Sequence, residues 1–152
     1  MARQKHTFNP TQSISLTISI TGEQAVQVDS HGGRERGSNV VVITDHVAVY
    51  VYDLAALATY ANGWIDPAVT AHHQLPELAE PFGTGPEYTP GIIIRAHGRD
   101  RIDHTFDVAR QVMIIRIGQV RWLVHDRVAY RSMSAAWAQA KDVGEIMLYS
   151  RR

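Results

Sequence analysis

The N-terminal part of the chain alternates between apolar and polar residues. In residues 13–21, SISLTISIT, aliphatic side chains alternate with serine and threonine, and residues 25–30 repeat the pattern over a shorter length. A period of two is typical of a strand with one buried face, so we expect two strands joined as a hairpin. Segment 31–39 is rich in glycine and charge and predicts a loop. Residues 40–52 then supply two more strands, with a turn at 45–46.

After Asp53 the spacing of apolar residues changes to that of a helix. The residues on its expected apolar face are Leu54, Leu57, Ala58, Ala61, Trp64 and Ile65. Asp53 directly precedes the first of them and is predicted to be the N-cap. Asn62-Gly63 is a candidate break in this helix. Asp66-Pro67 has the N-cap and N1 residues with which a second, short helix begins.

The second half of the chain repeats this order of elements. A connection over 76–90 holds four of the six prolines. Four strands are then expected in GIIIRA, IDHTFDVA, VMIIRI and VRWLVHD. Helical spacing resumes through Met133 and Trp137, with Ser132 or Ser134 as the cap. The predicted fold class is therefore α+β, with two ββββα repeats whose antiparallel sheets pack against helices.

A constant shift along the chain relates the two halves. The shift that carries Asp53 onto Asp126 also carries Trp64 onto Trp137, and we call it the repeat offset. Under the same shift, the residues expected to face the core in the preceding strands of one half fall on those of the other half, which favours an internal duplication. Two unrelated hairpin–helix units would also look alike at this level. The expected segments are a flexible N-terminus, a first half, a connection and a second half, at residues 1–12, 13–75, 76–90 and 91–150.

The hairpin VMIIRIGQVRWLVHD, residues 112–126, raises a question of charge. A turn at its central Gly-Gln is of type II′ and places Arg116 directly opposite Arg121. Like charges that face each other destabilise a sheet. Both arginines point away from the expected core, so we expect a negative group beside them. It would be a carboxylate such as Asp103 or Asp107, a carboxylate of a partner, or a phosphate.

The outer faces of the expected sheets therefore carry the candidate binding residues, namely Tyr50, Tyr52, Arg95, Arg116, Arg121 and His125. Aromatic rings stack on bases and guanidinium groups contact phosphates. In element order the chain resembles the Whirly and PC4-type single-stranded DNA-binding architecture, and the resemblance implies such a surface on the sheets. The resemblance also implies that the same architecture can serve protein interaction and self-assembly, as in actinobacterial SsgA-like cell-division proteins.

The overall charge and the amino-acid composition restrict which functions we expect of the chain. Fifteen Lys and Arg balance fifteen Asp and Glu, so nucleic acid would be attracted only by a local patch. Residues 40–52 are apolar on both faces, which favours contact between copies of the chain in a homo-oligomer. The absence of cysteine excludes disulfides and thiolate chemistry. Because no signal peptide or membrane-spanning run is evident, we expect a cytoplasmic protein that does not insert into membranes.

An enzymatic or metal-binding alternative rests on the histidines. His104 lies near Asp103 and Asp107, and His125 precedes Asp126. A histidine with a carboxylate can act as an acid–base pair, or help to hold a metal. Neighbours on a strand point to opposite faces, however, and no HExxH, GxSxG or Walker pattern occurs. We therefore predict a non-enzymatic binding or assembly module without a cofactor, and keep the small enzyme as an alternative.

Overall fold

The computed structural model describes residues 15–32, 38–44, 47–80 and 91–148. Several sequence predictions lie outside these residues, namely those for the N-terminus at 1–12, the middle of the glycine-rich loop at 33–37, the turn at 45–46 and most of the connection at 81–90.

The elements follow one another as the repeat predicts. They are β1 (Leu16–Ile20), β2 (Gln27–His31), β3 (Asn39–Ile43), β4 (Val47–Val51), α1 (Leu54–Ile65), α2 (Ala68–Gln74), β5 (Ile92–Ala96), β6 (Ile102–Asp107), β7 (Val112–Ile117), β8 (Val120–Val124) and α3 (Arg127–Leu148). Each half thus contributes four strands followed by helix, which confirms the predicted α+β class with two ββββα units.

Each sheet takes one strand from the other half. The two four-stranded sheets have the orders β1-β8-β7-β6 and β2-β3-β4-β5. β1 pairs in parallel with β8, and β5 pairs in parallel with β4. The hairpin expected between the first two strands is therefore wrong, because β1 and β2 lie in different sheets. Ile18 and Ile20 are buried in register with Trp122 and Val124 instead.

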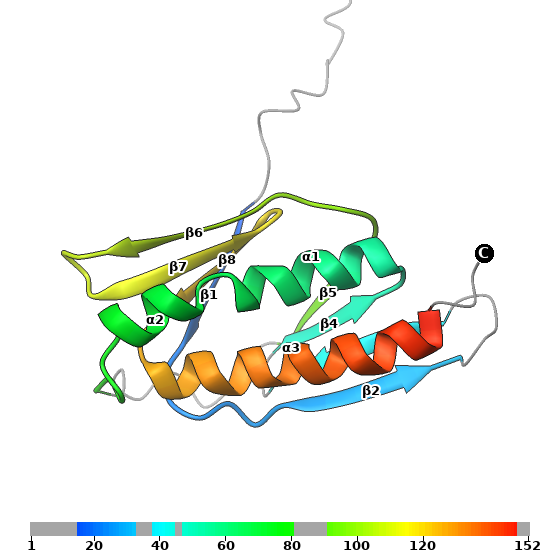
Figure 1. Ribbon diagram of the computed structural model, residues 1–152, viewed down its shortest axis with the longest axis horizontal. Coiled ribbons are helices and arrows are strands. Elements are labelled where there is room, and N and C mark those ends of the chain that lie inside the picture. Colours follow the sequence, from blue (N-terminus) through cyan, green and yellow to red (C-terminus); the bar gives the residue numbers. More distant parts are fainter. Residues whose placement is uncertain (1–14, 33–37, 45–46, 81–90, 149–152) are drawn as a thin grey trace, which may run out of the picture.

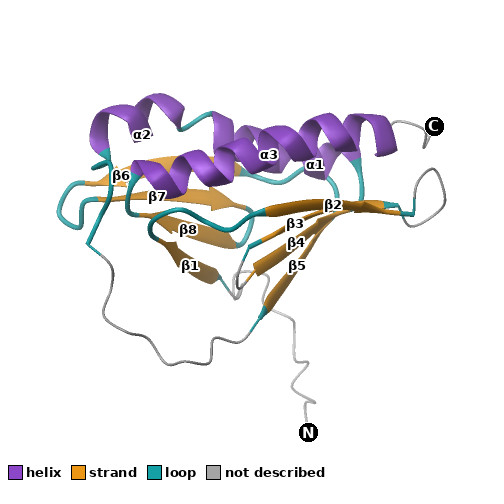
Figure 2. Ribbon diagram, turned by 90° about the horizontal axis from the view of Figure 1, so that it is seen from below, coloured by secondary structure: helices purple, strands orange, loops and turns teal. Residues whose placement is uncertain are grey.

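The helices lie together on one side of the sheets. Figure 2 shows them as an upper layer, with the β1-β8-β7-β6 sheet on the left below them and the β2-β3-β4-β5 sheet on the right. α1 and α3 run side by side (Figure 1). α1 packs mainly on β6 and β7, and α3 on β2 and β3, so each helix covers the sheet that holds most of the other half. Trp64 of α1 meets Trp122 edge-on at 5.4 Å between ring centroids in this core.

Two of the predicted details of α1 and α2 are wrong. Asp53 caps α1 as predicted, since its Oδ1 accepts the N–H of Ala56 at 2.8 Å. Asn62-Gly63 does not break the helix, and Gly63 is buried inside it, where an added Cβ would lie 2.8 Å from the side chain of Ile117. α2 begins after Pro67, which occupies the N-cap position predicted for Asp66.

α3 begins earlier than the serines predict. Its first residue is Arg127, and Asp126 Oδ1 accepts the N–H of Ala129 at 2.7 Å, as an N-cap does. Ser132 lies inside the helix, where its hydroxyl donates to the carbonyl of Val128 at 2.9 Å. The predicted cap at Ser132 or Ser134 is therefore wrong.

Hydrogen bonds join the two halves reciprocally. The carboxylate of Asp53 accepts the N–H of Gly98 at 2.7 Å, and that of Asp126 accepts the N–H of Gly22 at 2.9 Å. Both glycines lie two residues beyond a parallel strand and have positive φ angles, of 68° and 72°. At such angles glycine is the favoured residue. The chain crosses from one sheet to the other at these two corners.

A second pair of bonds repeats the relation. Thr59 Oγ1 accepts the N–H of Asp100 at 3.2 Å, and Ser132 Oγ accepts the N–H of Gln24 at 3.1 Å. The repeat offset carries Thr59 onto Ser132 as well. In these bonds, each half accepts a backbone N–H from the other half at the same position of the repeat. Such reciprocal contacts are characteristic of two units related by a two-fold axis. The repeat is thus present in the tertiary contacts as well as in the order of elements.

Candidate functional site

Three aromatic rings stack on the outer face of the β2-β3-β4-β5 sheet. The rings of Tyr50 and Tyr52 have centroids 6.5 Å apart and an interplanar angle of 18°. Those of Tyr52 and His97 are 4.5 Å apart and inclined by only 5°. Pairing continues just beyond β4, where the Tyr52 N–H donates to the carbonyl of Ala96 at 3.3 Å, and this places His97 beside Tyr52. We call Tyr50, Tyr52 and His97 the aromatic ladder.

Arg95 lies next to this aromatic ladder. It is the direct cross-strand partner of Tyr50, and its side chain is exposed. No carboxylate within the described ranges lies within 4.0 Å of its guanidinium group. Ile93, two residues earlier on the same face of β5, is 59% exposed. The surface therefore combines aromatic rings, an apolar side chain and a cation that no described carboxylate neutralises.

The opposed arginines lie on the outer face of the other sheet. Gly118 has a φ of 58°, as the first residue of a type II′ turn requires, and Arg116 pairs with Arg121 as predicted. Arg116 Nη1 lies 2.9 Å from Oδ1 of Asp103, its cross-strand partner on the opposite side. Arg121 instead donates to the hydroxyl of Thr17 on β1 at 3.2 Å. One predicted carboxylate thus reduces the repulsion, and a hydroxyl binds the other arginine.

His125 pairs with a hydroxyl group on β1. Its Nε2 lies 2.8 Å from Oγ of Ser19. Burial lowers the pKa of His125, although the nearby Asp126 carboxylate opposes this. Asp126 is fully buried, and its oxygens accept three backbone N–H groups. It therefore serves as a structural acceptor.

The structure divides the six candidate binding residues into two groups. Tyr50, Tyr52 and Arg95 lie on the β2-β3-β4-β5 sheet, and the others, Arg116, Arg121 and His125, lie on the β1-β8-β7-β6 sheet. Sequence reasoning missed His97, because its position depends on the parallel pairing of β4 with β5.

His104 lies in a separate cavity. This cavity has a volume of about 330 Å³, and Asp66 and Asp103 also line it. It is the place where the acid–base alternative would act. Among the described residues, no group of three or more His, Asp or Glu side chains is arranged to hold a metal ion.

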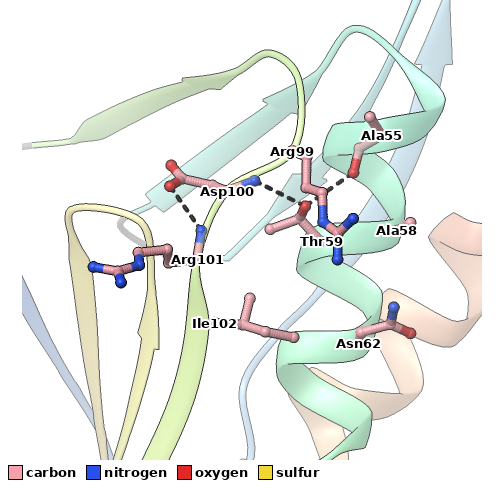
Figure 3. A pocket seen from close by; sticks show the side chains of 8 residues that line it. All are labelled: Ala55, Ala58, Thr59, Asn62, Arg99, Asp100, Arg101 and Ile102. Atoms are coloured by element: carbon pink, nitrogen blue, oxygen red, sulfur yellow. Dashed lines mark hydrogen bonds between the residues drawn. The ribbon is translucent and has the colours of Figure 1, made fainter.

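A larger cavity, of about 670 Å³, lies between α1 and the segment that joins β5 to β6. Figure 3 shows its lining residues, which are Ala55, Ala58, Thr59 and Asn62 of α1 together with Arg99, Asp100, Arg101 and Ile102. Sequence reasoning did not select these residues. The signal that could have found them is the pair of arginines in HGRDR, at 97–101.

Within the described segments, no helix is both long and apolar enough to cross a membrane. Comparisons with known protein families, with curated proteins and with solved structures found no match.

Proposed function

We propose that this chain is a binding module that holds single-stranded nucleic acid on the β2-β3-β4-β5 sheet. Bases would stack on the aromatic ladder, and a phosphate would contact Arg95. The observation that carries the proposal is the near-parallel stack of Tyr50, Tyr52 and His97 beside an arginine with no acidic partner in the described part of the chain. Every base has a π-face, so such a surface binds with little preference for sequence.

The charge balance sets the strength of such binding. The formal net charge of the whole chain is zero, so attraction would depend on local cations such as the Arg95 guanidinium group. A protein that contacts few phosphates releases few counterions, and its affinity therefore falls only gently as salt rises. We expect weak binding in which stacking contributes more than charge.

Fluorescence anisotropy of a labelled oligo-dT, at low salt, tests the proposal. Tyr52→Ala is expected to lower the affinity by about 5- to 150-fold, because one base–aromatic stack contributes about 1–3 kcal/mol. Arg95→Ala should also weaken binding and reduce the salt dependence. Arg110→Ala is the control, because Arg110 lies beyond β6 on the other sheet and pairs with Asp107 at 3.8 Å. Unchanged affinity in both test variants, or an equal loss in the control, would refute the proposal.

A second candidate function is self-assembly, and the exposed Ile93 favours it. β5 is an edge strand, and apolar residues on such edges are sites of association between chains. Light scattering after size exclusion should then show a defined oligomer that dissociates in the Ile93→Lys variant. A chain that is monomeric at every concentration tested would eliminate this candidate.

A further inference from the structure

A short segment of this chain binds along the first turn of α3. The N–H of Arg127 donates to the carbonyl of Pro76 at 2.9 Å. The N–H of Val128 donates to the carbonyl of Glu77 at 3.2 Å. The first N–H groups of a helix have no partner within the helix, so these carbonyls satisfy two of them.

The side chain of Glu77 strengthens this contact. Its carboxylate lies 3.2 Å from Nε of Arg127 and also forms an ion pair with Arg131. The hydrogen bond from Arg131 holds the pKa of Glu77 below its usual range. Two residues further on, the N–H of Ala79 donates to the Asp126 carboxylate at 3.1 Å. The segment is thus held through carbonyls, one N–H and a carboxylate.

Among the described residues, no such segment lies at the equivalent place on α1. The repeat offset carries Leu54, Ala55 and Ala58 onto Arg127, Val128 and Arg131. In the described part of the chain, no carbonyl accepts the N–H groups of Leu54 or Ala55. The cavity of about 670 Å³ lies at this place, and Ala55 and Ala58 line it. Alanine stands at position 58, where the other repeat has Arg131, the residue that pairs with Glu77.

The cavity carries a cation that the described residues do not neutralise. Figure 3 shows the Arg99 side chain extending over α1, whereas Arg101 points away from the helix. The carboxylate of Asp100 accepts the N–H of Arg101 at 2.8 Å. No carboxylate among the described side chains lies within 4.0 Å of the Arg99 guanidinium group. A negative ligand group would therefore be favoured at Arg99.

We propose that this cavity binds an extended, carboxylate-bearing segment of a partner protein. The carbonyls of that segment would accept the N–H groups of Leu54 and Ala55, and its carboxylate would contact Arg99. The contact of residues 76–79 with α3 is the precedent within the same molecule. Residues 1–14 of this chain are not the proposed occupant, because they contain two cations and no Asp or Glu. The surface is distinct from the aromatic ladder, so the inference does not depend on the nucleic-acid proposal.

The probe for this proposal is a blocked peptide with the sequence of residues 75–80, LPELAE. Titrated into the ¹⁵N-labelled full chain, it is expected to shift the backbone signals of Leu54, Ala55 and Thr59. The matched control peptide, LPQLAQ, lacks both carboxylates and should bind at least tenfold more weakly, because hydrogen bonds to charged groups contribute about 1.5–3 kcal/mol.

Two variants act in opposite directions. Arg99→Gln should weaken peptide binding by about tenfold or more. Ala58→Arg should strengthen it, because it installs the cation that meets Glu77 in the other repeat. A gain of affinity cannot result from failure to fold. Absence of shifts on α1, equal binding of the two peptides, or an Ala58→Arg variant that does not bind more tightly would each overturn the proposal. Shifts on α1 produced by oligo-dT and not by peptide would overturn it too, and would assign the cavity to nucleic acid instead.

Discussion

Replacing Asp126 by alanine is expected to destabilise the chain more than the equivalent replacement of Asp53. Asp126 is 0% exposed, and it accepts the N–H groups of Ala129, Gly22 and Ala79 at 2.7, 2.9 and 3.1 Å. Asp53 is only half-buried and accepts two N–H groups. The two aspartates occupy equivalent positions in the repeat, so each is a control for the other.

The expected losses follow from these partners. A side-chain N-cap contributes about 1 kcal/mol. A buried N–H left without an acceptor costs about 1–3 kcal/mol. Asp126→Ala removes a cap and leaves two further N–H groups unpaired, so we expect the free energy of unfolding to fall by about 3–7 kcal/mol. For Asp53→Ala, which leaves only one further N–H unpaired, we expect about 2–4 kcal/mol.

Urea unfolding followed by tryptophan fluorescence would measure both losses, because Trp64, Trp122 and Trp137 are all fully buried and report on the core. Asp126→Asn should give an intermediate loss, since its oxygen can still cap α3 while its NH₂ group faces two other donors. The reasoning would be refuted by equal losses at the two aspartates, or by a loss below about 1 kcal/mol for Asp126→Ala.

Three further variants test separate features. Burial lowers the pKa of His125 in the folded chain, so near the ordinary histidine pKa of 6.5 the unfolded chain binds more protons. The free energy of unfolding should therefore fall as the pH drops through 6.5. The His125→Gln variant should show a smaller fall when urea midpoints are compared across this pH range. Tyr130 donates its hydroxyl hydrogen to the carbonyl of Trp64, and Tyr130→Phe should cost about 1 kcal/mol at neutral pH. Burial raises the pKa of Tyr130 from 10.0 to about 12, so the variant should also lose less stability than the parent across that alkaline range. Gly63→Ala would place a methyl group 2.8 Å from the side chain of Ile117. In thermal unfolding, the variant should lose about 1–3 kcal/mol of stability. A melting midpoint like that of the parent would contradict the close approach of α1 to β7.

The first strand shows what the alternation of residues can and cannot predict. A period of two identifies the buried face of residues 13–21, and Ile18 and Ile20 are indeed buried. It does not identify the neighbouring strand, since a local hairpin and a distant parallel pairing bury the same side chains. The exchange of β1 and β5 between sheets depends on the corners at Gly22 and Gly98, whose bonds to aspartates 104 and 45 residues away have no local signature.

The start of α3 was predictable, in contrast, from the repeat itself. Asp53 is correctly predicted as an N-cap, and the repeat offset carries that role onto Asp126. Helical spacing alone favoured a later start near Ser132, because residues 127–132 include two arginines and a serine. A capping role carried over between repeats is therefore a better guide to this boundary than periodicity.

In the candidate sites too, the sequence predicts some features and not others. The opposition of Arg116 and Arg121 follows from a two-residue turn, and Asp103 was one of two carboxylates expected beside them. The stack of His97 on Tyr52 and the position of Arg99 over α1 depend on tertiary placement of the segment after β5. Local sequence patterns do not predict where that segment lies.

The most direct test of the proposed function is a backbone amide correlation spectrum of the ¹⁵N-labelled chain, titrated with a short oligo-dT at low salt. We predict that the shifted signals cluster in β4 and β5 and just beyond them, at Tyr50, Tyr52, Arg95 and His97, and that the shifts diminish as salt is raised. An unchanged spectrum, or shifts confined to other elements, would contradict the assignment of this sheet face to nucleic acid.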